Sequence, residues 1–214
     1  MSESNTIVLH HLNQSRSLRI LWLLEEIQVP YALKKYYRDA KTHLAPQNLK
    51  DIHPLGKSPV IEFNGKLIAE SGAIVEFLIQ KHAPSLAPQK DSDAYIDYLQ
   101  WIHFSESSAM VPYLLKVFYA MEQRQGTELK FLDRYAEAEF DKVFGYLNQQ
   151  LQDKQFLLGN YLTGADFMLG FVVYGLVNNM NIKQQYPHIV DYLNRLTALD
   201  SWQRAMKIEM QMSE

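Results

Sequence analysis

The sequence predicts an α/β domain with a small mixed sheet, followed by an all-helical domain. Three observations lead to this prediction. Strand-like and helix-like patterns alternate over residues 1–82. Residues 83–92 (APSLAPQKDS) are rich in Pro, Ser and Ala and lack periodicity, which is typical of a linker. In residues 93–214 the apolar side chains keep helical spacing, so we expect a helical domain there.

The chain opens with a strand, a helix and a second strand. Residues 6–11 (TIVLHH) predict a short buried strand that ends in a polar loop. Residues 15–27 are apolar around most of a helical circumference, so we expect this helix to be covered on more than one side. Pro30 ends it, and residues 31–37 (YALKKYY) favour a strand.

A hairpin and an amphipathic helix complete the first domain. Residues 38–48 are polar and predict a loop with a short irregular helix. Two apolar runs at 58–63 and 66–69 are separated by Asn64-Gly65, and both of these residues accept a positive φ, so a hairpin is expected. Residues 71–82 then read as a helix with one apolar face. The predicted order is β-α-β-(α)-β-β-α.

The second domain is predicted to contain only helices. They are expected over residues 94–110, 129–151, 163–178 and 187–199, with a short last helix capped by Asp200-Ser201. Pro112 is expected to kink or break the first of them. Gly126-Thr127 marks a turn. Thr163 and Asp166 have the spacing of a capping box, which we interpret as structural, because it starts a strongly apolar helix.

Composition and charge exclude several classes of function. The 214 residues include 21 basic and 24 acidic side chains, and a net charge of −3 argues against nucleic acid as the main partner. No apolar run approaches the ~18 residues of a membrane span, and the start MSESNT has no features of a secretion signal. Cysteine is absent, which excludes disulfides, thiolate metal sites and a cysteine nucleophile, and fits a reducing, cytoplasmic location.

Three short segments are candidate ligand sites, each with a purely structural alternative. Either Ser15 directs its hydroxyl at a bound anion, or Ser15 or Asn13 only caps the next helix. Pro59 either leaves neighbouring backbone groups for a ligand, with a cis bond to Ser58, or simply starts a strand. Glu70 and the helix start at Ser71 either hold the two charges of an amino-acid end or only cap the helix.

Two further groups of residues favour structural readings. His10 and His11 are adjacent on a strand and point to opposite faces, so they do not ligate one metal simply, and we expect no metal site. Met110, Tyr113, Phe118 and Tyr119 either line an apolar pocket or belong to the core, and a stripe of Met and aromatic residues is more often core.

Together, these segments resemble the cytosolic glutathione transferases over nearly the whole chain. The most specific motifs are HPLGKSPVIEF at 53–63, LIAESGAIVEFL at 67–78 and YLTGADFMLG at 161–170. The stretch NQSRSLRILWLLEE at 13–26 is most similar to bacterial and fungal members with a serine-type first helix. The resemblance implies a thioredoxin-like glutathione-binding domain and a helical domain that supplies the pocket for the second substrate.

The resemblance also implies roles for single residues. Ser58, before a cis Pro59, is expected to exchange backbone hydrogen bonds with the cysteinyl part of glutathione, although this position is usually apolar in the family. Glu70 and Ser71 are expected to hold its γ-glutamyl end. The glycine carboxylate is expected to face Lys57, with Lys41 or Arg38 as a further cation. Asn13, Met110, Tyr113 and Phe118 are the residues expected in the pocket for the second substrate.

The catalytic hydroxyl is expected in the loop before the first helix. The first tyrosine, Tyr31, follows that helix, so a tyrosine-type site is excluded, and the lack of cysteine excludes a cysteine-type site. Ser15 lies four residues before Arg19, a spacing found in related serine-type members, so it is the primary candidate. Ser17 and Asn13 remain alternatives.

The resemblance thus implies a glutathione transferase that converts glutathione to its thiolate and adds it to small hydrophobic electrophiles. Glutathione serves as co-substrate, and no other cofactor is expected. A homodimer is also implied. Two alternatives share the fold: a glutathione-dependent peroxidase acting on organic hydroperoxides, and a non-catalytic protein that binds glutathione or serves as a scaffold.

Overall fold

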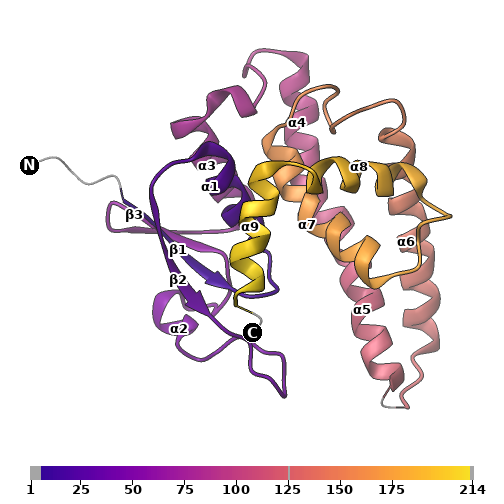
Figure 1. Ribbon diagram of the computed structural model, residues 1–214. Coiled ribbons are helices and arrows are strands. Elements are labelled where there is room, and N and C mark those ends of the chain that lie inside the picture. The colour runs from indigo at the N-terminus through magenta and orange to yellow at the C-terminus, as the bar shows by residue number, and fades with distance from the viewer. Residues whose placement is uncertain (1–5, 125, 213–214) are drawn as a thin grey trace, which may run out of the picture. The chain divides into compact units, whose positions relative to one another are not determined.

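The computed structural model describes residues 6–124 and 126–212 (Figure 1). The chain divides into two compact units, Met1–Leu86 with Thr197–Glu214, and Ala87–Leu196. No helix among the described residues combines the length and apolar character needed to cross a membrane.

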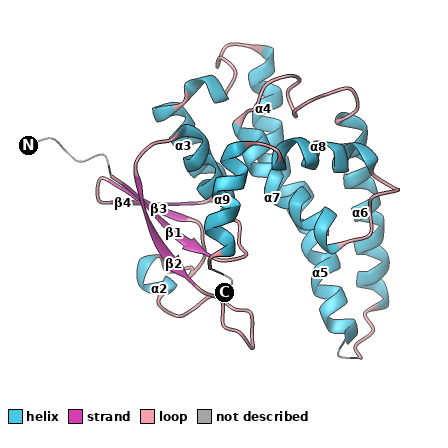
Figure 2. Ribbon diagram, viewed as in Figure 1, coloured by secondary structure: helices cyan, strands magenta, loops and turns pink. Residues whose placement is uncertain are grey.

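A four-stranded mixed sheet forms the centre of the first unit (Figure 2). Its strands are β1 (Ile7–Leu12), β2 (Tyr31–Tyr36), β3 (Val60–Phe63) and β4 (Lys66–Ala69), in the order β2-β1-β3-β4. β1 runs parallel to β2 and antiparallel to β3, and β3 runs antiparallel to β4. Asn64 and Gly65 have φ of 50° and 75°, as the predicted hairpin requires.

Helices α1 and α3 belong to the same unit as the sheet. They span Leu18–Ile27 and Ser71–His82, and the short helices α2 and η1 span Leu49–Ile52 and Pro84–Leu86. Every residue of α1 from Leu18 to Leu24 is buried, which confirms that this helix is covered on more than one side. It begins three residues later than predicted, because residues 15–17 form a turn before it.

The last helix, α9 (Asp200–Met210), belongs to the first unit, although the sequence places it in a helical domain over 93–214. Its apolar side chains pack on α1: the rings of Trp202 and Trp22 meet edge to face with centroids 4.9 Å apart. The hydroxyl of Ser201 accepts a hydrogen bond from the Trp22 indole at 3.0 Å. The expected Asp200-Ser201 cap is wrong, since Leu199 occupies the cap position without a side-chain hydrogen bond.

The second unit is helical, as predicted. Its helices are α4 (Asp93–Phe104), η2 (Ser105–Ala109), α5 (Met110–Arg124), α6 (Lys130–Gln150), α7 (Gly164–Asn179) and α8 (Pro187–Thr197). Thr163 and Asp166 form the predicted capping box of α7. The Asp166 carboxylate accepts hydrogen bonds from the backbone of Thr163 and Leu157 and from the Tyr192 hydroxyl, so this group is structural.

The expected break at Pro112 is wrong, because α5 continues through this residue. The irregularity lies one turn earlier, in η2, which is a single turn of π-helix. A proline cannot donate to the carbonyl four residues before it, which is that of Ser108. The π-helical turn therefore lies next to the position where an α-helical hydrogen bond is missing. The hydrogen-bond pattern changes there, but the helix does not end.

Candidate functional site

The segments that the sequence singles out meet at one edge of the sheet. Leu12 at the end of β1 is in register with Tyr36 at the end of the parallel strand β2. Val60 at the start of β3 is in register with His10 of β1 on one side and Ala69 of β4 on the other. The loops after β1, β2 and β4 and before β3 therefore lie side by side. This edge carries the candidate residues of the glutathione site.

Ser58 ties the start of β3 to the end of β1. Its hydroxyl donates to the carbonyl of His10 at 2.8 Å and accepts from the backbone N–H of Leu12 at 3.2 Å. The peptide bond between Ser58 and Pro59 is cis, as the resemblance implies. The two hydrogen bonds give a physical reason for a polar side chain at a position that is usually apolar in the family.

Glu70 and Ser71 form the turn between β4 and α3. Glu70 has a φ of 66° and is exposed, so its carboxylate is open to a ligand at the sheet edge. The expectation that Ser71 caps α3 is wrong, because Ser71 is the first helical residue and Glu70 occupies the cap position. The Ser71 hydroxyl is buried and accepts a hydrogen bond from the guanidinium of Arg19 at 2.9 Å. Arg19 thus joins α1 to the start of α3.

Ser15 is buried and bound to its own loop. Its hydroxyl donates to the carbonyl of Leu12 at 2.7 Å and accepts from the backbone N–H of Ser17 at 3.1 Å. The exposed fraction of Ser15 is 5%. Both bonds lie within the loop, but the expectation that Ser15 caps α1 is wrong, because Ser17 occupies the cap position of that helix. The hydroxyl has one proton, so it must release Leu12 before it can donate to a thiolate.

The two alternative thiol contacts differ in availability. The Ser17 hydroxyl is fully buried and lies 2.8 Å from Nδ1 of His11. Asn13 is half-buried, and its side-chain oxygen accepts the backbone N–H of Arg38 at 2.9 Å. That bond leaves the amide NH₂ of Asn13 without a partner among the described residues. Asn13 is therefore the more accessible of the two.

The three expected cations differ in their surroundings. Lys57 is exposed and directly precedes Ser58, which places it at the sheet edge. Lys41 is exposed in the loop after β2. The Arg38 guanidinium instead donates to the carbonyl oxygens of His43 and Gln14 at 2.9 and 3.2 Å. Burial, followed by the nearby charge of Arg16, lowers the pKa of Arg38. Lys57 and Lys41 are thus open to a ligand, whereas the Arg38 guanidinium already has two acceptors.

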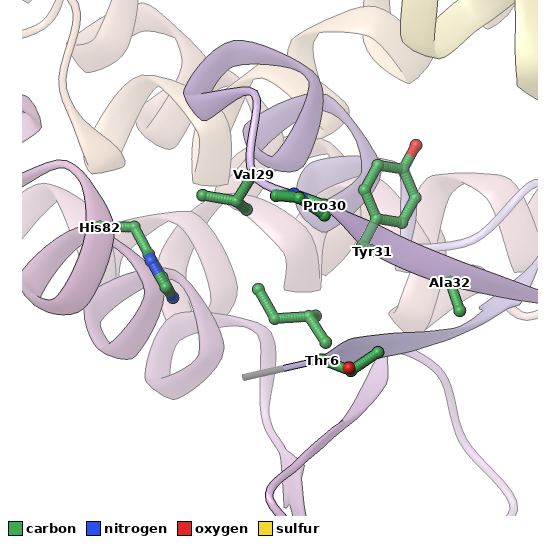
Figure 3. A pocket seen from close by; sticks show the side chains of 7 residues that line it. Thr6, Val29, Pro30, Tyr31, Ala32 and His82 are labelled. Carbon is green, nitrogen blue, oxygen red and sulfur yellow. The ribbon is translucent and has the colours of Figure 1, made fainter. Parts of the chain in front are cut away.

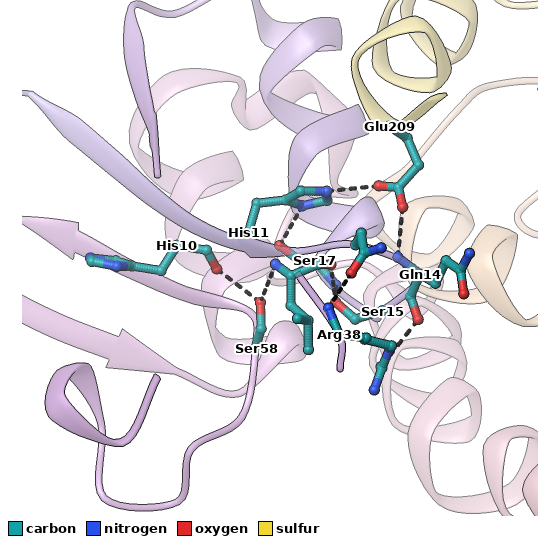
Figure 4. A network of polar contacts seen from close by, with 10 residues as sticks. His10, His11, Gln14, Ser15, Ser17, Arg38, Ser58 and Glu209 are labelled. Carbon is teal, nitrogen blue, oxygen red and sulfur yellow. Dashed lines mark hydrogen bonds and ion pairs between the residues drawn. The ribbon is translucent and has the colours of Figure 1, made fainter. Parts of the chain in front are cut away.

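Glu209 belongs to the polar network around residues 13–17, a place that no sequence motif predicts (Figure 4). Its carboxylate contacts His11 and the backbone of Gln14, although the two segments are almost two hundred residues apart in sequence. A signal was present: Glu209 continues the spacing of the buried residues Trp202 and Ala205 on α9. A carboxylate on a core-facing helix position is rare unless it has a partner.

The two adjacent histidines have separate structural partners. Nδ1 of His10 lies 2.9 Å from the Tyr36 hydroxyl, whereas His11 contacts Ser17 and Glu209. Burial, followed by the charge of Lys34, lowers the pKa of His10. The described residues contain no cluster of three or more His, Cys, Asp or Glu side chains able to hold a metal.

The residues expected in the second-substrate pocket lie mostly inside the helical unit. Met110 is buried, and so is Tyr113, whose hydroxyl accepts from the Asn179 amide at 3.1 Å. Phe118 has an exposed fraction of 55%. The burial of Met110 and Tyr113 is what the core alternative predicts, while Phe118 is open to a ligand.

A pocket of about 440 Å³ in the first unit lies away from these residues (Figure 3). It is lined by Thr6, Ile7, Val29, Pro30, Tyr31, Ala32 and His82. Because it adjoins the starts of β1 and β2, it lies at the opposite end of these strands from the candidate site.

The fold and the sheet-edge site can now be compared with known proteins. The family model described as glutathione S-transferase, N-terminal domain, matches residues 4–80. The model described as glutathione S-transferase, C-terminal domain, matches residues 96–203. The chain therefore belongs to the glutathione S-transferase family.

Individual relatives agree with this assignment. The chain is 33% identical over 199 residues to glutathione S-transferase 3 of Schizosaccharomyces pombe, covering 86% of this chain and 79% of that protein. It is 26% identical over 216 residues to glutathione S-transferase 1 of Saccharomyces cerevisiae, covering 92% of each. A crystal structure of a glutathione S-transferase from Actinobacillus pleuropneumoniae has a TM-score of 0.85 and 33% identity, over 97% of this chain and 96% of that one.

Some relatives are much longer proteins. The chain is 29% identical over 157 residues to elongation factor 1-gamma of Carassius auratus, which covers 70% of this chain and 33% of that protein. The three transferase relatives match over 79–96% of their own length. The predictions of a thioredoxin-like domain with a helical domain, and of a glutathione S-transferase, are confirmed.

Proposed function

We propose that this glutathione transferase is a serine-type member that binds glutathione along the sheet edge and converts it to the thiolate at Ser15. The observation that carries the proposal is the meeting of three segments at that edge: the loop 13–17, the cis bond before Pro59, and the turn Glu70-Ser71. The buried Arg19, near the start of α1, donates to the Ser71 hydroxyl and so ties the helix that follows the loop 13–17 to the turn Glu70-Ser71.

Glutathione has groups that match this edge. Its γ-glutamyl end carries an ammonium and a carboxylate, which pair with the exposed Glu70 and with the N–H groups at the start of α3. Its glycine carboxylate pairs with Lys57, and Lys41 is the further cation. Its cysteinyl backbone pairs with that of Ser58, beside the cis bond. The thiol then faces the loop after β1.

The energy needed to form the thiolate is modest. A thiol with a pKa near 8.5 requires about 2.7 kcal/mol of preferential thiolate binding to lower that pKa by roughly 2 units. One hydrogen bond to a charged acceptor contributes roughly 1.5–3 kcal/mol, and the N-terminus of α1 adds about 0.3–1 kcal/mol. After about 1 kcal/mol is subtracted for freeing a hydroxyl donor that is already hydrogen-bonded, the two contributions sum to roughly 0.8–3 kcal/mol, and the upper part of this range meets the requirement without a general base.

Ser15 supplies that donor by turning its hydroxyl from the Leu12 carbonyl toward sulfur. Loss of the hydrogen bond to a neutral carbonyl costs about 1 kcal/mol. A hydrogen bond to the charged thiolate contributes more, roughly 1.5–3 kcal/mol. The backbone N–H of Ser17 stays with the Ser15 oxygen during this turn, since it uses a lone pair and not the proton. The amide of Asn13 is the alternative donor.

The resemblance also implies a location, an oligomeric state and a class of second substrate. We propose that the protein is cytoplasmic and forms a homodimer. We further propose that it acts on small hydrophobic electrophiles. The exposed ring of Phe118 is the one of the four expected pocket residues with a large apolar surface open to such a molecule. Met110 and Tyr113 are buried.

The first experiment measures glutathione binding by calorimetry and turnover of 1-chloro-2,4-dinitrobenzene on the same sample. Binding with turnover supports the proposal. Binding with turnover of cumene hydroperoxide alone replaces the transferase with a glutathione-dependent peroxidase. Absence of glutathione binding contradicts the proposed site.

A second candidate is a non-catalytic glutathione-binding protein. The similarity to elongation factor 1-gamma proteins favours it, since these share the same region within much longer chains. The Ser15 hydroxyl is hydrogen-bonded within its own loop, which also favours a protein that does not activate the thiol. Retention on immobilised glutathione without turnover of any electrophile or hydroperoxide would decide for this candidate.

A further inference from the structure

Glu209 on the last helix bridges two parts of the loop that precedes α1 (Figure 4). Its exposed fraction is 6%, so the carboxylate is nearly removed from water. Oε2 lies 2.7 Å from Nε2 of His11, and Oε1 accepts the backbone N–H of Gln14 at 2.6 Å. A buried carboxylate with two such partners is held firmly. If either hydrogen bond were lost, the free-energy cost of removing the charge from water would no longer be compensated.

The Gln14 contact fixes a backbone conformation that the residue does not favour. Gln14 has a φ of 50°, in the left-handed region that non-glycine residues rarely adopt. Its N–H is held by the Glu209 carboxylate, and its carbonyl accepts from the Arg38 guanidinium at 3.2 Å. The backbone N–H of Gln14 is thus bound by a negatively charged group and its carbonyl by a positively charged one. Strained conformations of this kind persist where the surroundings determine them, and they concentrate at functional sites.

The His11 contact fixes the other end of the loop. His11 is fully buried, and its second ring nitrogen lies 2.8 Å from the hydroxyl of Ser17, directly before α1. Glu209 therefore reaches Gln14 directly and Ser17 through His11. The two proposed thiol donors, Asn13 and Ser15, are the direct neighbours of Gln14.

We propose that Glu209 is a positioning residue for thiolate formation, acting from the last helix through Gln14 and His11. This inference rests on the proposed function. The carboxylate holds the loop in the conformation that aims its donor at sulfur. Loss of Glu209 raises the pKa of the bound thiol and lowers kcat, while the KM for glutathione changes little, because Glu70, Ser71 and Ser58 bind the rest of that molecule.

The test compares Glu209→Gln and Glu209→Ala with a matched control on the same helix. Glutamine keeps the shape of the side chain, but its single oxygen cannot serve both N–H donors, whereas alanine removes both contacts. The control is Arg204→Gln. Arg204 joins α9 to Glu25 of α1 through bonds of 3.0 and 2.6 Å, and it is absent from the network around Gln14.

We expect kcat to fall about 10-fold in Glu209→Gln and further in Glu209→Ala, since a reacting group displaced by about 1 Å can cost roughly 100-fold. The pKa of the bound thiol should rise by about one unit in Glu209→Gln, with the KM for glutathione within about 2-fold. Arg204→Gln should match the wild type in both. Equal losses in Arg204→Gln and Glu209→Gln, or a change in KM alone, would overturn the proposal.

Amide hydrogen exchange separates this inference from the proposed function. Exchange across residues 13–17 should accelerate in both Glu209 variants and stay unchanged in Arg204→Gln, whether or not the wild type turns over an electrophile. Wild-type protein that neither binds nor activates glutathione contradicts the proposed function. Unchanged exchange in folded Glu209→Ala contradicts the positioning role, and so does a Glu209→Gln variant that fails to fold, since Glu209 would then serve general stability.

Discussion

Ser15→Ala separates the two roles that the structure gives to this hydroxyl. As the thiolate donor, Ser15 contributes roughly 1.5–3 kcal/mol but gives up about 1 kcal/mol of bonding to the Leu12 carbonyl, so the net gain for the charged form is roughly 0.5–2 kcal/mol, or about 0.4–1.5 pKa units. Starting from a bound-thiol pKa of about 6.5, its loss lowers the thiolate fraction at pH 7 about 1.4- to 8-fold, and kcat with it. Affinity for glutathione should change little, because the peptide groups are bound elsewhere.

The same substitution also removes two local hydrogen bonds. The Leu12 carbonyl and the Ser17 N–H each lose a partner, which costs about 2 kcal/mol in the free energy of unfolding. For a chain of this size that lowers Tm by roughly 4–8 °C. Kinetics are therefore measured well below the new Tm, with the folded fraction established by circular dichroism.

The assay titrates the ultraviolet absorbance of bound thiolate in the wild type and in Ser15→Ala. Thr163→Ala is a control, because it removes a hydrogen bond of the α7 capping box in the other unit. A higher thiol pKa in Ser15→Ala but not in Thr163→Ala supports the donor role. A thiol pKa that is equal in all three proteins would exclude the donor role and leave Ser15 as a purely structural residue.

Three further predictions concern neighbouring groups. Asn13→Ala should shift the bound-thiol pKa by less than about 0.5 unit in the same titration, and a larger shift than that of Ser15→Ala would transfer the donor role to Asn13. Thr163→Ala should lower the free energy of unfolding by about 1 kcal/mol in urea titration, because it removes a helix cap; an unchanged midpoint would contradict this. Burial depresses the pKa of His10 below its ordinary 6.5, so the unfolded chain takes up a proton first as the pH falls. Stability should therefore decline below pH 6.5, and less so in His10→Asn; parallel pH profiles of Tm would exclude this cause.

The sequence predicted the sheet and its helices where local patterns determine the structure. The hairpin at Asn64-Gly65 and the helix Ser71–His82 follow from turn chemistry and helical periodicity, which act over a few residues. The start of α1 was placed three residues early, because Ser15 and Ser17 use their side chains for local bonds that compete with helix. Propensity alone does not reveal such bonds.

Long-range packing accounts for the other differences. The cap expected at Ser71 is replaced by a contact with Arg19, 52 residues away. The last helix belongs to the same unit as the sheet because Trp202 packs against Trp22. No local sequence pattern predicts this long-range contact. Glu209 was overlooked for the same reason: its partners His11 and Gln14 lie at the other end of the chain. The candidate site was predicted from motifs, but its supporting contacts required the fold.

We propose that this protein lowers the pKa of the glutathione thiol and uses the resulting thiolate. The most direct measurement is the rate of wild-type turnover of 1-chloro-2,4-dinitrobenzene as a function of pH, with glutathione saturating. We expect an apparent pKa near 6.5, about 2 units below that of a free thiol. A rate that follows the uncatalysed reaction, with an apparent pKa near 8.5, would show that the protein does not activate the thiol.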